Sequence, residues 1–367
     1  MKILFLSNLV SYTYHFRIEI IKALLQKGHQ VSIAAETDNL DMRTAFENMG
    51  CTFIETPFDG KGTSIKRDGK LLASYIHMIR KMKPDVVFSF TIKQNLYGGI
   101  AAKLCRTKYA PMITGLGELE KKEKLQKLLI FLHKCVIPYA DVVFFQNKDN
   151  SVFFQDHGIQ TKREIFLPGS GVNTEAFPYQ VYPGEKDGIA FGFIGRLIPA
   201  KGIEQYLEAA SYFAEKKKNV IFHIAGKCDP QYEKTIEKLH KSGVIVYHGV
   251  LDDTKHLYER IHCLVLPTYH PEGMSNVLLE AAACGRPAIC TDRVGCKEII
   301  SDGENGFYCK AKDSANLIQV IERFCSLPWQ EKKKMGLIGR KKVVEYFSRE
   351  TVVLHYLQYV EMMKLDS

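Results

Sequence analysis

The sequence lacks the features that identify several large classes of protein. No apolar run reaches the roughly 18 residues that a membrane-spanning helix needs, and the nearest candidate, 128–145, is interrupted by charged residues and a proline. No G-x-G-x-x-G turn follows a strand, which disfavours a dehydrogenase, and no P-loop is present. No nucleic-acid motif or aromatic-interleaved basic platform occurs either.

The cysteines and acidic residues do not form a metal-binding pattern. The ten cysteines include no C-x-x-C pair, and the six-residue spacing of Cys284, Cys290 and Cys296 matches no common zinc site. We therefore expect reduced, mostly buried thiols in a cytosolic protein. No D-x-D triplet stands at a strand end, so we expect no metal ion. The opening residues 1–8 are too short for the apolar core of a signal peptide and predict a first β-strand.

The remaining pattern is that of a two-domain α/β protein. A chain of 367 residues, 46% hydrophobic and 25% charged, is long enough for two ordinary globular cores. Apolar strands alternate with helices in two rounds separated by a Pro- and Gly-containing linker at 173–188, which predicts parallel sheets covered on both faces. The predicted strands lie near 3–7, 31–35, 86–90, 111–114, 142–146 and 164–167, and then near 189–194, 220–225, 244–248, 264–267, 288–291 and 306–309.

The segment between Glu272 and Glu280 carries the clearest chemical signal. Gly273 allows close backbone approach, and Ser275 or Asn276 can cap the apolar helix that follows. The unpaired amides and the dipole at such a helix start form an anion site. Glu280, one turn into the helix, can accept hydrogen bonds from a ribose diol, and Glu272 can do so from sugar hydroxyls. Taken alone, two glutamates fit ordinary solvated charges better.

A second group of residues follows the predicted strand at 189–194. Gly195 and Arg196 end that strand, and Lys201 precedes a helix predicted from Ile203 to Lys218. Ligands bind at such carboxyl ends of parallel strands. Arg196 can bind a diphosphate bidentately and Lys201 as a point charge, although each cation alone also fits an ordinary surface residue.

In combination, these motifs resemble family-4 glycosyltransferases of the GT-B fold. The resemblance covers most of 189–310 and is looser in the N-terminal half. It is carried by Gly195-Arg196-Leu197, Lys201-Gly202, Pro271-Glu272-Gly273, Glu280, Gly285-Arg286-Pro287, 294–300 and 302–307. Glu272–Asn276 and Tyr14-His15-Phe16-Arg17 look like bacterial enzymes of surface-polysaccharide or lipid-linked oligosaccharide assembly. Such enzymes often use UDP-hexose or UDP-N-acetylhexosamine donors.

The resemblance implies two Rossmann-like β/α/β domains that face a central cleft. Residues 1–175 would bind the acceptor, 176–348 the nucleotide sugar, and a C-terminal helix in 349–367 would cross back to the N-terminal domain. The implied activity is a retaining, metal-independent hexosyl transfer, without cofactor, to a glycan or polyprenyl-diphosphate-linked sugar. The implied location is the cytoplasm, with peripheral contact to the inner face of the cell membrane.

The resemblance also implies residue roles. Arg196 and Lys201 would bind the donor diphosphate, and the base would lie near Gly226 and Val250. The donor set comprises Gly195, Arg196, Lys201, Gly226, Val250, Glu272, Gly273, Met274, Ser275, Asn276, Val277 and Glu280.

The N-terminal half departs from the family where a catalytic histidine often stands. The corresponding stretch, 112–118, contains none, so His15 and Glu118 are the candidates to replace it, while Gly115 and Gly117 would allow close approach of a substrate. The resulting catalytic set is Arg196, Lys201, Glu272 and His15.

Positive charge is concentrated in the N-terminal half. Residues 1–175 carry 24 Lys and Arg against 17 Asp and Glu, a net of +7, whereas the rest carries 26 against 24, a net of +2. The Lys121–Lys134 region combines lysines with an apolar helical pattern, which suits an anionic membrane or equally a helix packed on its own domain. A second basic segment contains Lys61, Lys66, Arg67 and Lys70.

Two other functions fit parts of the pattern. One is a GT-B enzyme of another reaction, but epimerases lack the Glu-x7-Glu loop, and glycogen-type phosphorylases need a pyridoxal lysine in a much longer chain. The other is a non-catalytic nucleotide-sugar-binding partner, which the complete set of Arg196, Lys201, Glu272 and Glu280 disfavours.

Overall fold

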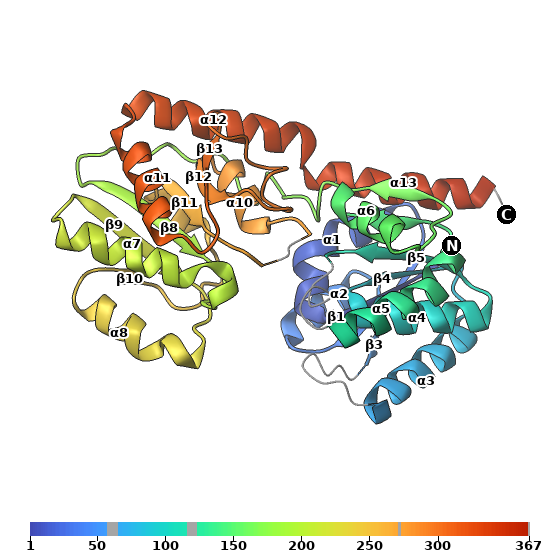
Figure 1. The fold of residues 1–367 in the computed structure, drawn as a ribbon. Helices are drawn as coiled ribbons and strands as arrows, with labels where there is room; N and C mark the ends of the chain where they lie inside the picture. The colour runs from blue at the N-terminus through green and yellow to red at the C-terminus, as the bar shows by residue number, and fades with distance from the viewer. Residues whose placement is uncertain (57–64, 116–122, 271–272, 366–367) are drawn as a thin grey trace. The chain divides into compact units, whose positions relative to one another are not determined.

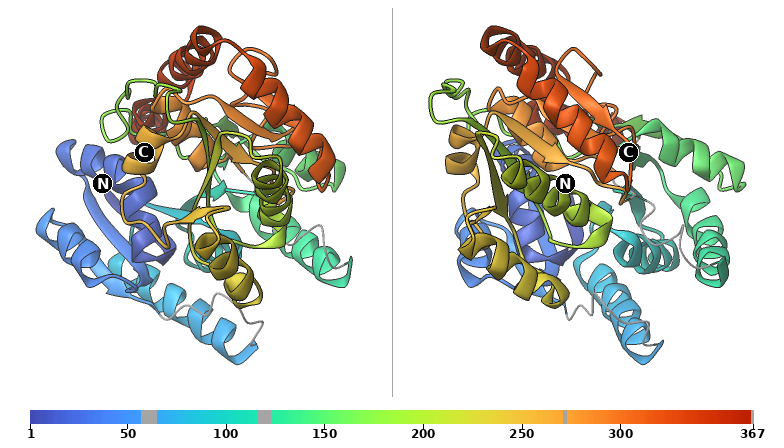
Figure 2. Two further views of the ribbon diagram at one scale, coloured as in Figure 1. Left: turned by 90° about the vertical axis from the view of Figure 1, so that its left-hand side faces the viewer. Right: turned by 60° about the vertical axis from the view of Figure 1, so that its left-hand side comes forward.

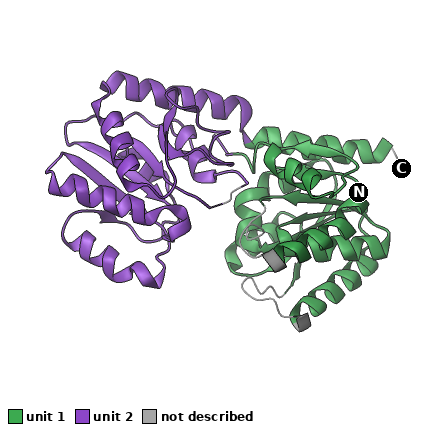
Figure 3. Cartoon of the chain, in the orientation of Figure 1, with its two compact units in different colours: residues 1–171, 349–367 green, residues 172–348 purple. Residues whose placement is uncertain are grey.

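A computed structural model of the chain describes residues 1–56, 65–115, 123–270 and 273–365. The chain divides into two units, coloured green and purple in Figure 3. Unit 1 comprises Met1–Gly171 with Arg349–Ser367, and unit 2 comprises Val172–Ser348.

Unit 1 contains a parallel sheet of seven described strands in the order β3-β2-β1-β4-β5-β6-β7 (Figure 1). The central strands are almost continuous runs of buried side chains, as expected where helices cover both faces. The strands are β1 (Lys2–Leu9), β2 (Gln30–Glu36), β3 (Thr52–Glu55), β4 (Val86–Phe90), β5 (Lys108–Ile113), β6 (Val143–Phe145) and β7 (Glu164–Phe166).

Helices cover both faces of this sheet. They are α1 (Val10–Gln26), α2 (Leu40–Asn48), α3 (Ile65–Met82), α4 (Ile92–Cys105), α5 (Glu123–Val136), α6 (Lys148–Asp156) and α13 (Arg349–Leu365), with a 3-10 turn η2 (Ile137–Tyr139). Helices α1, α2 and α13 share one hydrophobic core, and α3, α4 and α5 share the core on the other face (Figures 1 and 2). Helix α13 therefore completes unit 1, where the Tyr356 ring stacks on Phe144 with centroids 4.6 Å apart.

Unit 2 repeats the arrangement with six described strands in the order β10-β9-β8-β11-β12-β13. The strands are β8 (Ile189–Ile194), β9 (Val220–Ala225), β10 (Val246–Tyr247), β11 (Cys263–Leu266), β12 (Ala288–Thr291) and β13 (Gly306–Cys309). The helices are η3 (Pro199–Lys201), α7 (Ile203–Glu215), η4 (Pro230–Tyr232), α8 (Glu233–Lys241), α9 (Lys255–Arg260), α10 (Asn276–Ala283), α11 (Ser314–Ser326) and α12 (Trp329–Tyr346).

The predicted alternation of strands and helices in two parallel sheets is confirmed, with a few local differences. Strand β3 has no counterpart among the predicted strands, because this edge strand is only four residues long and none of its side chains is fully buried. Helix α7 ends at Glu215 rather than Lys218, since Lys217 adopts a left-handed conformation with φ of 50°. The predicted helix at the C-terminus is observed as α13.

Among the described residues, no helix is both long and apolar enough to cross a lipid bilayer. The free cysteines are mostly buried, as predicted, and Cys135 on α5 is the exposed exception.

Candidate active site

The carboxyl ends of β8 and β9 are joined by backbone contacts between glycines. Gly195 and Gly226 have φ of 150° and 141°, and a Cβ on Gly226 would lie 1.8 Å from the Gly195 carbonyl oxygen. The Gly226 amide donates to the Gly249 carbonyl at 2.7 Å, so the segment after β10 belongs to the same edge. No described atom lies within 4 Å of a Cβ built on Gly195, which leaves bare backbone facing open space.

The two predicted diphosphate-binding cations follow β8. Arg196 is exposed, and Lys201 is half-buried at the end of η3. Gly202 holds the next turn with φ of 80°, where a Cβ would lie 2.2 Å from the Pro267 carbonyl oxygen. The Ala200 carbonyl accepts hydrogen bonds from the segment after β11, at 3.1 Å from the Thr268 hydroxyl and 2.9 Å from the Tyr269 amide. The Lys201 turn and the segment 268–269 after β11 are therefore one assembly; Pro271 and Glu272 lie outside the described residues.

Helix α10 begins beside this assembly. Gly273, Met274 and Ser275 are buried, while Asn276 and Val277 are half-buried. Ser275 occupies the N-cap position, but its side chain makes no capping bond, so the predicted side-chain cap is wrong at this residue. Its buried hydroxyl has no hydrogen-bond partner among the described residues. The first-turn amides of α10 consequently have no cap from that hydroxyl.

The start of α10 is held in place through its backbone. The Ser275 amide donates to the Gly295 carbonyl at 2.9 Å, and the Gly295 amide donates to the Glu298 carboxylate at 2.7 Å. These two hydrogen bonds were not predicted, because no local sequence pattern connects Ser275 with residues twenty positions further along the chain. These two hydrogen bonds place Gly295 and Glu298 of the predicted 294–300 motif next to the N-cap residue of α10.

Glu280 is half-buried on α10 and is oriented by a tyrosine. The Tyr258 hydroxyl, on α9, donates to Glu280 Oε2 at 3.0 Å and also lies 3.2 Å from the Val277 carbonyl oxygen. Burial, followed by the charge of Glu280, raises the pKa of Tyr258 well above its usual value, so the phenol stays a proton donor. Tyr258 was not among the predicted site residues, since it lies on a separate helix and no motif marks it.

The predicted base-binding edge lies after β10. Val250 is 68% exposed and follows Gly249. Beside it, His248 Nε2 lies 3.0 Å from Nδ1 of His223 on β9. Burial, the neighbouring His248 and then Arg260 lower the pKa of His223 to about 4, so His223 is neutral at pH 7.

The predicted residues of the N-terminal half belong to unit 1. His15 is an exposed residue of α1 whose backbone carbonyl accepts a hydrogen bond from Arg349 at 3.0 Å. Partial loss of solvation lowers the pKa of His15. The negative charge of Asp38 opposes that shift, and the positive charge of Arg349 adds to it. Gly115 follows β5 with φ of 144°. Gly117 and Glu118 lie outside the described residues.

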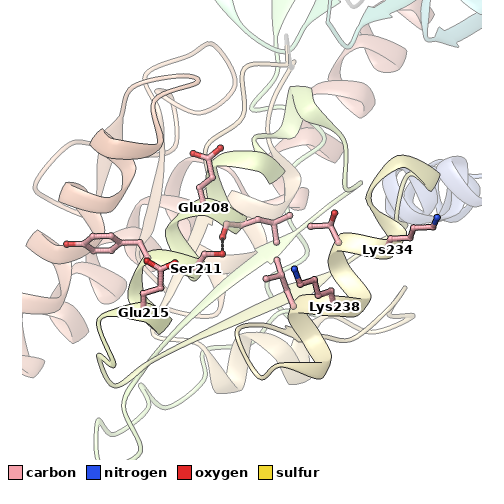
Figure 4. A pocket seen from close by; sticks show the side chains of 9 residues that line it. Glu208, Ser211, Glu215, Lys234 and Lys238 are labelled. Carbon is pink, nitrogen blue, oxygen red and sulfur yellow. Dashed lines mark hydrogen bonds between the residues drawn. The ribbon is translucent and has the colours of Figure 1, made fainter.

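A surface groove between α7 and α8 lies apart from these residues (Figure 4). Carboxylates of Glu208 and Glu215 line it from α7, and the ammonium groups of Lys234 and Lys238 line it from α8. None of the predicted donor residues lines this groove, so it does not belong to the candidate site. In the described part of the chain, no three His, Cys, Asp or Glu side chains are grouped to hold a metal ion.

Two family models match the chain and together span most of it. Residues 180–342, almost all of unit 2, match glycosyl transferases group 1. Residues 2–147 of unit 1 match the glycosyl transferase 4-like family. With its two Rossmann-like units, the chain belongs to the family-4 glycosyltransferases of the GT-B fold, as the sequence motifs predicted.

Several curated proteins are similar to this chain along most of their length. An N,N'-diacetylbacillosaminyl-diphospho-undecaprenol alpha-1,3-N-acetylgalactosaminyltransferase from Campylobacter jejuni is 26% identical over 339 residues, 88% of each chain. A UDP-Gal:alpha-D-GlcNAc-diphosphoundecaprenol alpha-1,3-galactosyltransferase from Escherichia coli is 24% identical over 284 residues, 72% of each chain.

Solved structures share the fold. Anabaena HepE in complex with UDP and glucose has a TM-score of 0.79 at 18% identity, covering 98% of this chain and 99% of its own. A glycosyltransferase from Rickettsia africae has a TM-score of 0.79 at 19% identity, covering 100% of this chain and 99% of its own. At these identities the comparison establishes the GT-B architecture.

Proposed function

We propose that this glycosyltransferase moves a hexose or N-acetylhexosamine from a UDP-linked donor to a polyprenyl-diphosphate-linked sugar or related glycan, with retention of configuration. The observation that carries the donor half is the contact between Tyr258 and Glu280, which holds a carboxylate one turn inside α10, whose start the Ser275 side chain does not cap. The named activities of the Campylobacter jejuni and Escherichia coli relatives support the acceptor half.

In this proposal each part of the donor meets matching chemistry on unit 2. Arg196 and Lys201 bind the diphosphate, aided by the first-turn amides of α10. Glu280 accepts hydrogen bonds from the ribose, and Glu272 accepts them from the transferred sugar. The base lies against bare backbone near Gly226 and the exposed Val250.

The proposed reaction needs charge stabilisation more than a strong protein base. The acceptor hydroxyl forms the new bond to the anomeric carbon on the face from which the diphosphate leaves. A phosphate oxygen of the departing diphosphate takes the hydroxyl proton, so a retained linkage and a protonated nucleoside diphosphate result. Arg196 and Lys201 balance the charge that develops on the leaving group, which is the largest contribution such a site can make. The reaction is proposed to need no metal ion and no cofactor.

The acceptor determines where the enzyme works. A polyprenyl-linked sugar is held in a bilayer, so the proposal places the chain in the cytoplasm and at the inner face of the cell membrane. In unit 1, His15 is proposed to contact the acceptor, and Gly115 is proposed to give the backbone room for it.

Titration calorimetry with UDP, GDP and dTDP tests the donor half directly. We expect UDP to bind without divalent metal and Glu280→Gln to weaken UDP more than tenfold. Donor hydrolysis followed by NMR should release the sugar at an unchanged rate in EDTA. Binding of GDP in preference to UDP would refute the donor assignment, and a strict requirement for added metal would refute the metal-free reaction. Binding of UDP without any hydrolysis or transfer would favour a non-catalytic partner.

A further inference from the structure

Helix α5 presents apolar side chains on two of its faces. Its inner face packs into unit 1, where His133 and Val136 are buried and Leu129 lies against the core. Its outer face leaves Leu128 and Phe131 52% and 61% exposed. The sequence allowed either a packed helix or a membrane-facing one, and among the described residues α5 packs through its inner face.

The exposed apolar residues form a single stripe. Leu128, Phe131 and the exposed Cys135 are three and four residues apart, so they follow one another along one side of the helix. Exposed apolar patches of this kind mark interaction surfaces more often than isolated exposed leucines do. The inner face holds α5 in the fold, so the outer stripe is not needed for folding.

Cations border this stripe. Lys127 and Lys134 are exposed on α5. On the neighbouring helix α4, Lys103 donates to the Cys135 carbonyl at 3.3 Å, next to Leu104, which is 59% exposed. Apolar side chains bordered by lysines match the two layers of an anionic bilayer, its acyl chains and its charged headgroups.

We propose that the outer face of α5, with the end of α4, is the surface by which this chain docks on an anionic membrane. Phe131 and Leu128 enter the boundary between headgroups and acyl chains, while Lys127, Lys134 and Lys103 meet the phosphates. The biological need for this contact rests on the proposed lipid-linked acceptor, but the contact itself can be measured without it.

Sedimentation with vesicles of phosphatidylglycerol and phosphatidylcholine tests the surface on the full chain. We expect binding to mixed vesicles and little binding to phosphatidylcholine alone. The variant Lys127→Gln/Lys134→Gln should bind about thirtyfold more weakly, which corresponds to roughly 1 kcal/mol per lysine. The variant Leu128→Ser/Phe131→Ser should bind at least tenfold more weakly. Two control variants carry matched changes at exposed positions elsewhere in unit 1. Vesicle binding should be unchanged in Lys22→Gln/Lys364→Gln and in Leu354→Ser.

Each outcome decides the proposal. Unchanged vesicle binding in both α5 variants overturns it, and so does equal loss in the control variants. If Leu128→Ser/Phe131→Ser abolishes self-association in light scattering without affecting vesicles, the stripe is a contact between protein chains instead. Calorimetry with UDP keeps the two proposals separate, because the α5 variants should bind UDP normally. A chain that binds vesicles but not UDP would refute the donor site and leave the membrane surface standing.

Discussion

Replacing Tyr258 with phenylalanine tests whether a fixed carboxylate is central to nucleotide binding. The substitution removes one hydroxyl, which donates to Glu280 at 3.0 Å and lies 3.2 Å from the Val277 carbonyl oxygen, and keeps the buried ring. A hydrogen bond to a charged group contributes about 1.5–3 kcal/mol. Water can reach the half-buried Glu280 and replace part of that bond, so we expect unit 2 to lose about 1–2 kcal/mol of stability. For a domain of this size that corresponds to a fall in Tm of roughly 2–8 °C.

The effect on nucleotide binding separates a positioning role from a structural one. Without the Tyr258 hydroxyl, the Glu280 carboxylate loses one of the contacts that orient it before the nucleotide binds, and we expect about tenfold weaker UDP binding. Since the ribose does not change during the reaction, KM for the donor should rise while kcat stays nearly constant. The variant should also discriminate less between UDP and 2'- or 3'-deoxy-UDP, because those hydroxyls are what Glu280 is proposed to bind.

Tyr206 provides a matched control. It is also fully buried in unit 2, and its hydroxyl donates to two carbonyl oxygens, at 3.1 Å to Phe191 and 2.9 Å to His223. Tyr206→Phe should therefore lower the Tm without changing the affinity for UDP. If both variants bind UDP like the original chain, or if both lose affinity in proportion to their loss of stability, the positioning role of Tyr258 is refuted.

Three further predictions concern unit 2. Lys201→Ala should abolish transfer and leave the Tm within about 2 °C, because Lys201 is only half-buried; measurable activity near the original rate would remove it from the site. Arg286→Lys should destabilise unit 2 by about 3 kcal/mol or more in urea titrations, since one ammonium group cannot reach carbonyls on both sides of the buried guanidinium. His223 is neutral in the fold with a pKa of about 4, below the roughly 6.5 of an unfolded chain, so stability should fall by about 1 kcal/mol per pH unit between pH 6.5 and 4. His223→Gln should flatten that part of the pH profile, and an unchanged slope would contradict the assigned protonation state.

The elements that could be predicted from the sequence are those with strong local signals. Strands 189–194, 220–225, 288–291 and 306–309 are observed at the predicted bounds, because each is a short apolar run bounded by polar or glycine residues. The half-exposed edge strand β3 has no such run. A local signal also predicted the end of strand 189–194 at Gly195, whose φ of 150° would strain a residue with a side chain.

The candidate site was only partly predictable for a physical reason. Arg196 and Lys201 stand next to strand and helix boundaries, so their positions follow from secondary structure. Tyr258 contacts Glu280 from another helix, and Glu298 is linked through Gly295 to Ser275 at the start of α10. Contacts of this kind depend on how helices and strands pack against one another, and no local pattern in a single sequence predicts them.

Three arginines of this chain differ in how the surrounding structure occupies their guanidinium groups. Arg286 is 1% exposed and donates to the carbonyls of Tyr258, Gln180 and Val181, so its guanidinium group joins the linker to helix α9. Arg349, at the start of α13, is committed in the same way to the Gly171 carbonyl and to Glu19. Arg196 is exposed at the end of β8, where a guanidinium remains accessible to a ligand. Buried carbonyl groups need a hydrogen-bond partner, and Arg286 supplies one to the carbonyls of the linker, so its loss should lower the stability of unit 2. Arg196 has no such structural task among the described residues, so changing it should lower the affinity for the nucleotide sugar and leave the stability unchanged.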